Sequence, residues 1–272
     1  KKFIIILISS LLYQSPLLSK SASFEEFNSR NLSKYFSGIV AFENEESSEA
    51  LSYFNSSKIL INQHDPYLEK LVMSLILEDK VTQAINFVKA NSKKNNSNFF
   101  EAYILLVLDS LKKDNINKAF EILSEIPENL KKKRFNYIIF NSLKQYVYVF
   151  KNKKILKENK NLNNLSFISE TFQRCYLGDD KTGSFFSKLI NNSQADYSRY
   201  IYFYLTYLIE NNQIEEAKTV TDELDYISTT LLLSQGKSWI EGNELNKFSK
   251  VFSCSNHNDI VSEFLFLVSN LY

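Results

Sequence analysis

Residues 35–57 of the chain, YFSGIVAFENEESSEALSYFNSS, contain two apolar segments separated by a polar one. Apolar residues recur at intervals of three and four over residues 35–42, stop over residues 43–46, and resume over residues 50–54. This spacing is typical of an amphipathic helix. The stretch therefore predicts a helix, a short polar turn and a second helix.

The same pairing recurs along the chain at a fixed interval. A small residue followed four positions later by a large apolar one occurs at Ala50, Ala84 and Ala119, which are 34 and 35 residues apart. Gly183 and Ala217, each at the start of a second helical segment, are separated by another 34. A small residue lets two crossing helices approach closely. A fixed period of this length indicates stacked supersecondary units.

The rest of the chain predicts further helix pairs with less regular spacing. Pairs are expected at 68–77 with 84–88, 102–111 with 119–123, 200–209 with 217–224, and 230–241 with 245–252. First helices are expected at 136–150 and 167–177, with a frayed second helix and loop at 155–165, where the pattern is degraded around Lys153. Residues 259–272 predict a lone amphipathic helix without a packing partner. Terminal repeats need a polar cap, so we expect a C-terminal truncation and further chain beyond Tyr272.

The first helix pair resembles a tetratricopeptide repeat (TPR). The small and aromatic residues that match the spacing of that family are Gly38, Ala41, Ala50, Phe54 and Ser57. Later units keep mainly the small residue of the second helix, and Pro66 and Pro127 resemble the proline that ends a repeat. The resemblance implies an all-α fold, a right-handed α-solenoid of antiparallel helix pairs with about six to seven repeats. Other families of helical-pair arrays stay open as an alternative.

The composition favours helices and excludes several classes of protein. With 44% hydrophobic and 23% charged residues, the 272-residue chain can bury a core, which excludes general disorder. It has only 5 Gly and 3 Pro, whereas β-sandwiches and barrels of this length use many more at their turns. The formal net charge of +1 indicates neither a nucleic-acid-binding nor a polyacidic surface.

Residues 1–23 have the pattern of a secretory signal peptide. Two lysines precede an apolar run, and small residues precede an expected cleavage site after Ser23. The run is short and interrupted by polar residues and a proline, which argues against a stable membrane span; an uncleaved anchor or a core helix stays open. We therefore expect the mature domain, 24–272, to be secreted across the inner membrane into the periplasm, with no membrane span and no nucleic-acid partner.

No arrangement of residues predicts catalysis, a cofactor or a metal site, and we do not expect an enzyme. Cys254 and His257 are close in sequence, but no second Cys/His pair follows to complete a zinc site. Cys175 and Cys254 form an even pair, for which a disulfide stays open in an oxidising compartment. They lie more than two repeats apart, however, and an extended solenoid brings only neighbouring repeats together. Two buried free thiols are therefore expected.

The clusters of charged residues have structural explanations. The acidic pairs Asp179 with Asp180 and Asp222 with Asp225 are suitable for acid–base chemistry, but at helix starts and turns they predict caps or solvated surface. The basic cluster at 131–134 predicts a solvated turn between helices, with contact to an acidic partner as the alternative.

The resemblance also implies where a partner binds. In TPR proteins the first helix of each pair lines a concave groove, and several of its positions point into that groove. Large aromatic side chains with a few charges suit recognition of a protein or peptide. The candidate groove residues carried over in this way are Phe42, Met73, Lys112, Gln145, Tyr146, Phe172, Tyr176, Arg199, Tyr202 and Thr206.

These features together predict a non-catalytic TPR scaffold or adaptor for protein–protein interaction in the bacterial cell envelope. A bacterial origin agrees with a composition rich in Lys, Asn, Ile and Phe. Two alternatives stay open. In one, the solenoid positions the substrate of a larger envelope enzyme, such as a cell-wall hydrolase with catalytic residues beyond Tyr272. In the other, a structural protein self-associates through its terminal helix.

Overall fold

The structure is a computed structural model that describes residues 28–62, 64–91, 98–156, 164–191, 198–223 and 231–270. Over these ranges the chain forms α-helices and short 3-10 helices, with no strand. The predicted all-α class is therefore confirmed. The predicted signal peptide, 1–23, lies outside the described residues.

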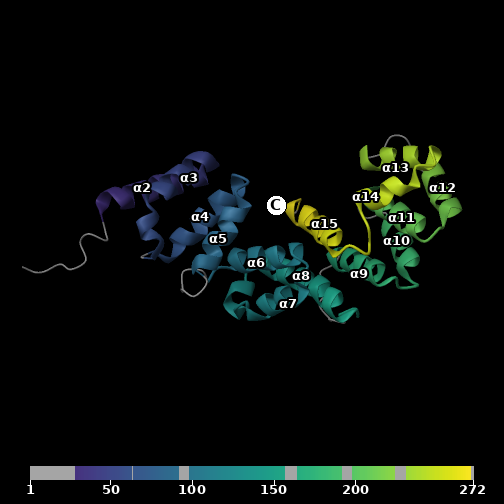
Figure 1. Cartoon of the computed structure of the whole chain (residues 1–272), viewed down its shortest axis with the longest axis horizontal. Helices are drawn as coiled ribbons and strands as arrows, with labels where there is room; N and C mark the ends of the chain where they lie inside the picture. The colour runs from purple at the N-terminus through teal and green to yellow at the C-terminus, as the bar shows by residue number, and fades with distance from the viewer. Residues whose placement is uncertain are drawn as a thin grey trace, which may run out of the picture. The chain divides into compact units, whose positions relative to one another are not determined.

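The chain divides into two compact units between Asn98 and Phe99. The helices of unit 1 are α2 (Ser29–Glu43), α3 (Ser47–Ser56), η1 (Lys58–Asn62), α4 (Asp65–Leu77) and α5 (Val81–Asn91). Those of unit 2 are α6 (Phe100–Lys112), α7 (Ile116–Glu125), η3 (Glu128–Lys131), α8 (Arg134–Asn152), α9 (Asn164–Leu177), α10 (Thr182–Ile190), α11 (Ser198–Glu210), α12 (Ile214–Asp222), α13 (Leu231–Glu241), η4 (Leu245–Lys247), α14 (Phe248–Val251) and α15 (His257–Ser269), as Figure 1 shows. The prediction of a single array over 24–272 stays a prediction.

Consecutive helices pack against one another in both units. In unit 1, α2 packs on α3 and α4 on α5; in unit 2, each helix from α6 to α13 packs on the next helix of the chain. The helices expected at 136–150 and 167–177 are α8 and α9. Most of the stretch 155–165, expected to be a frayed helix and loop, lies outside the described residues. The predicted repeat-like packing of helices is confirmed.

Six helices end in the same turn, which explains the period of the sequence. The turn that follows each of these helices contains one residue with a left-handed backbone. The N–H of that residue donates to the carbonyl three positions back. The next N–H donates to the carbonyl five positions back, which completes a Schellman motif. The left-handed residues are Glu45, Asp79, Asp114, Gly178, Asn212 and Asn243. Most of these turns recur at the 34- and 35-residue intervals of the small residues.

After five of the six turns, a small residue lies five positions after the left-handed residue, whereas Phe248 occupies this position after Asn243. Ala50, Ala84, Ala119 and Ala217 are completely buried where the second helix crosses the first. In the first pair, the ring of Phe54 also lies against Gly38, where an added Cβ would come within 2.8 Å of it. Close helix crossing therefore depends on small residues, because a larger side chain would separate the backbones.

Two glycines of unit 2 make a matched test of this turn. Gly178 has φ +63° and open space around its Cα, so Gly178→Ala is expected to cost about 1 kcal/mol through backbone conformation alone. Gly183 is helical, and an added Cβ would meet Tyr207 at an ordinary 3.5 Å. Gly183→Ala is therefore expected to stabilise by about 0.5 kcal/mol. Urea unfolding measures both, and equal effects of the two substitutions would contradict the assigned turn.

Candidate partner-binding groove

The last described helix, α15, returns to helices far back in the sequence. The ring of Phe264 lies 5.6 Å from that of Tyr146 on α8, centroid to centroid. The Nε2 atom of His257 lies 3.1 Å from the carbonyl oxygen of Leu111, the next-to-last residue of α6. Figure 1 shows α15 in yellow beside α8. The prediction of a terminal helix without a packing partner was therefore wrong, while the truncation after Tyr272 stays a prediction.

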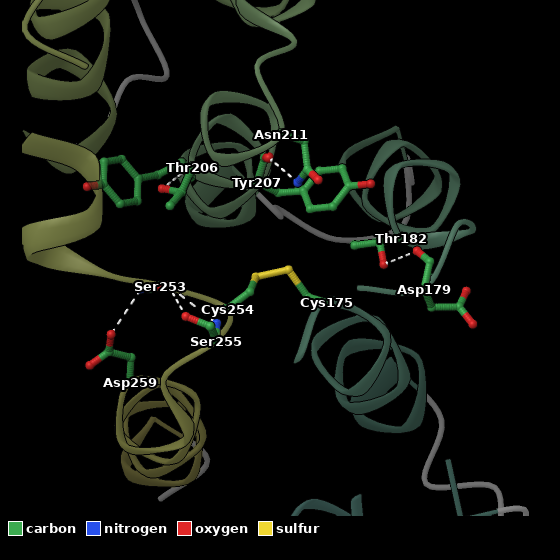
Figure 2. Close-up of a disulfide and its surroundings, with 11 residues drawn as sticks. Cys175, Asp179, Thr182, Thr206, Tyr207, Asn211, Ser253, Cys254, Ser255 and Asp259 are labelled. Carbon is green, nitrogen blue, oxygen red and sulfur yellow. Dashed lines mark hydrogen bonds between the residues drawn. A yellow bond between two sulfur atoms is a disulfide. The ribbon is translucent and has the colours of Figure 1, made fainter. Parts of the chain in front are cut away.

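A disulfide joins α9 to the segment that precedes α15. Cys175 and Cys254 are bonded, with their Cα atoms 5.4 Å apart, and Figure 2 shows the bond between the two segments. On the same segment, the Ser253 N–H donates to the Asp259 carboxylate at 2.9 Å, which secures the start of α15. The prediction of two free thiols was wrong because the chain folds back on itself, whereas contact only between neighbouring repeats was assumed.

One face of α15 is buried against the unit and the other is open. The buried face follows helical spacing and consists of His257, Ile260, Val261, Glu263 and Phe264. On the outer face, Leu265 and Phe266 are 38% and 44% exposed. Ile260, Val261 and Phe264 of the predicted apolar stripe are therefore buried against helices of the same chain, whereas Leu265 of that stripe remains exposed.

A single ion pair fastens α15 to α11. The Nε atom of Arg199 lies 2.9 and 3.1 Å from the two carboxylate oxygens of Glu263, and its Nη2 lies 2.6 Å from one of them. Glu263 is only 4% exposed. Burial raises the pKa of Glu263, and the hydrogen bonds and charge of Arg199 act in the opposite direction. The guanidinium also lies 3.9 Å from the ring centroid of Phe266.

Buried polar side chains line α8 and α9 next to this contact. The Ser169 hydroxyl donates to Gln145 Oε1 at 3.0 Å, and Gln173 donates to the same oxygen at 3.3 Å. Tyr146 is buried beside them. Burial raises the pKa of Tyr146, which Ser169 opposes as a hydrogen-bond partner and the charge of Glu263 reinforces. The polar groups thus join α8 to α9, and the ring of Tyr146 joins α8 to α15.

Five of the predicted groove residues are inaccessible to a partner. Gln145, Tyr146, Phe172, Tyr202 and Thr206 are all buried. Tyr146 is covered by α15, Phe172 contacts Phe252 just before that helix, and Tyr202 stacks on Phe248 of α14. The prediction that these side chains contact a ligand does not hold in this structure, because all five are buried and three of them contact the chain's own C-terminal segments.

The other five predicted residues reach the surface. Arg199 is partly exposed and contacts α15. Tyr176 is half-buried under the ammonium group of Lys153, and Lys112 is exposed. The remaining two, Phe42 and Met73, belong to unit 1 and are half-buried. The structure therefore brings together Tyr146 and Arg199 around α15, while Glu263 and Phe264, which complete the contact, were missed.

A pocket of about 640 Å³ opens beside the ion pair. It lies among α11, α13, α14 and α15, and its walls include Arg199, Phe203, Leu231, Phe252 and Glu263. Leu231 is 85% exposed at this site. A pocket of this volume, lined about equally by apolar and polar residues, is large enough for side chains of a bound peptide.

The residues considered for metal binding and acid–base chemistry have other contacts. Among the described residues, no three His, Cys, Asp or Glu side chains cluster as metal ligands. Cys254 is in the disulfide. Asp179 Oδ1 accepts from the Lys181 N–H at 3.0 Å and pairs with Arg174 at 2.9 Å, at the turn before α10. Asp225 lies outside the described residues.

The basic cluster at 131–134 lies in the turn between α7 and α8. Lys131 pairs with Glu128 at 2.8 Å, and its ammonium lies 4.3 Å from the ring centroid of Phe140. Lys132, Lys133 and Arg134 are exposed. The cluster therefore has the solvated position that was predicted for it.

Within the described part of the chain, no helix has the length and apolar character needed to cross a membrane. Comparisons with protein families, with characterised proteins and with solved structures find no match to this chain.

Proposed function

We propose that the protein is a non-catalytic scaffold or adaptor that holds a protein partner on the inner face of a TPR-like, right-handed α-solenoid in the bacterial periplasm. The observation that carries the proposal is the docking of α15. The inner side of unit 2 receives an amphipathic helix through an ion pair and an aromatic contact. A surface that accommodates one helix in this way has the chemistry to bind another.

The recurrent turns support the solenoid. Six helices end in one motif, and the second helices of four pairs carry a completely buried alanine at one position relative to that turn. Stacked repeats of helix pairs create extended concave surfaces that bind proteins. The packing of Phe54 on Gly38 agrees with the small and aromatic positions of the TPR pattern.

The disulfide supports export. Disulfides persist in oxidising compartments such as the periplasm and are rare in the cytosol. The Cys175–Cys254 bond joins two buried residues of unit 2. It agrees with the signal peptide expected over residues 1–23. The self-assembly alternative stays open, because Leu265 and Phe266 on the outer face of α15 remain exposed.

In-cell photo-crosslinking tests the adaptor function. A photoreactive residue is placed at Gln235 or Ser262, both exposed on the walls of the pocket, and at Ser184 on α10 as a matched exposed control. We expect one recurrent envelope protein in adducts from positions 235 and 262, and at least tenfold less of it from position 184. Adducts of equal yield from all three positions, or none from the pocket, would reject the proposal.

A further inference from the structure

We infer that α15 is an internal occupant of the partner groove, and that the partner is an amphipathic helix with an acidic residue followed directly by an aromatic one. This inference rests on the proposed function and adds the chemistry of the partner. It also explains why Tyr146, one of the groove residues predicted in unit 2, is covered.

The buried positions of α15 have the pattern of a helix bound in a groove. His257, Ile260 and Phe264 stand at i, i+3 and i+7, with Val261 at i+4, and all four are buried. Helices that dock in hydrophobic grooves use anchors at these positions. The main packing partners of α15 are α6 and α8, and its contact with Leu111 spans 146 positions of the sequence. In this respect α15 resembles a bound ligand more than a further member of the array, whose helices pack on their neighbours.

The ion pair provides specificity. The groove supplies one cation, Arg199, and the helix supplies one carboxylate, Glu263, next to Phe264. A competing helix with a neutral or basic residue at the position of Glu263 would leave a partly desolvated guanidinium without its partner, which is unfavourable. A helix with Glu or Asp at that position and an aromatic residue after it would satisfy both contacts.

The attachment of α15 keeps it at high local concentration. The disulfide at Cys254 holds the chain three residues before the start of the helix. An outside helix therefore competes with a tethered one, and effective concentrations for short tethers are in the millimolar range. Removal of the disulfide is therefore expected to strengthen the binding of a separate helix, because the groove residues themselves are unchanged.

A labelled peptide tests the inference directly. The probe is a fluorescein-labelled peptide of residues 255–270, SNHNDIVSEFLFLVSN, added to the full chain and followed by fluorescence anisotropy. We expect a dissociation constant at least tenfold lower for the chain with Cys175→Ser and Cys254→Ser than for the oxidised natural chain. A probe with Glu263→Lys is expected to bind at least tenfold more weakly than the natural probe.

A charge exchange separates recognition from general loosening. In the cysteine-free chain, Arg199→Glu should reverse the preference, so that the Glu263→Lys probe binds more tightly than the natural probe. The Glu263→Lys chain retains the disulfide while repelling its own α15. This variant tests the inference even if the cysteine-free chain does not fold. The Glu263→Lys chain should bind the natural probe more tightly than the natural chain does.

Three results would overturn the inference. They are equal binding of the natural and Glu263→Lys probes, no binding to any chain, and a cysteine-free chain that forms dimers by exchanging α15, since the occupant would then be a second copy. If one of these results is found while crosslinked adducts still form at positions 235 and 262, the inference is rejected but the proposed adaptor function is not. Loss of the adducts would reject that function independently of the probe.

Discussion

Replacement of both Cys175 and Cys254 by serine is expected to lower the free energy of unfolding of unit 2 by about 4 kcal/mol. The two cysteines are 79 positions apart. Removal of their bond therefore frees a long loop in the unfolded chain and raises its entropy. Both residues are buried, and the bond joins α9 to the segment that leads into α15. Its loss should therefore release α15 before the helix pairs unfold.

Trp239 provides the measurement. It is the single tryptophan of the chain and is buried on α13, so its fluorescence during urea denaturation reports unit 2. A reductant should lower the free energy of unfolding of the natural chain by the same amount. It should not change that of the double variant, which controls for effects of the reductant itself. A difference below about 1 kcal/mol would mean that packing and the ion pair hold α15 without the bridge.

The helix pairs could be predicted because their determinants are local. Ala50, Ala84 and Ala119 mark helix crossings within 10 residues of the turns that precede them, and the polar residues at those turns interrupt the apolar spacing. Apolar spacing predicts an amphipathic helix wherever it occurs. α15 was therefore also predicted as a helix, with an apolar face.

The partner of that apolar face could not be predicted from the same information. An apolar stripe shows that a helix is covered but does not indicate what covers it. The expectation that repeats contact only their neighbours excluded contact between α15 and α8, and it excluded the Cys175–Cys254 bond for the same reason. Both errors therefore have one physical cause, the return of the C-terminal segments to helices 79 or more positions earlier in the sequence.

The predicted groove residues differ in what they contact. Tyr146 on α8 and Arg199 on α11 both contact α15. Tyr202 lies three positions after Arg199 on α11, but its side chain points toward α14 and stacks on Phe248. The packing of later helices therefore decides which side chains of α8 and α11 remain accessible.

Arg199→Ala is expected to lower the free energy of unfolding of unit 2 by about 3 kcal/mol at neutral pH. The substitution leaves the Glu263 carboxylate buried without the guanidinium that donates hydrogen bonds to it and balances its charge. It also removes the contact with the Phe266 ring. This value is at the lower end of the free-energy cost of breaking a buried ion pair, because the side chain of Arg199 is 35% exposed. Urea denaturation followed through Trp239 measures the change.

The pH dependence identifies the cause of this loss. Burial already raises the pKa of Glu263 in the natural chain, and removal of Arg199 takes away the group that opposes the increase. With a folded-state pKa above the unfolded one, protonation favours the folded state, so the variant should regain stability as the pH falls through the raised pKa. The difference in the free energy of unfolding between the Arg199→Ala variant and the natural chain should therefore become smaller as the pH is lowered. Glu263→Gln removes the titrating carboxyl group. The variant with both Arg199→Ala and Glu263→Gln should therefore not gain stability as the pH falls. A loss that is independent of pH would instead assign the effect to the ring contact with Phe266.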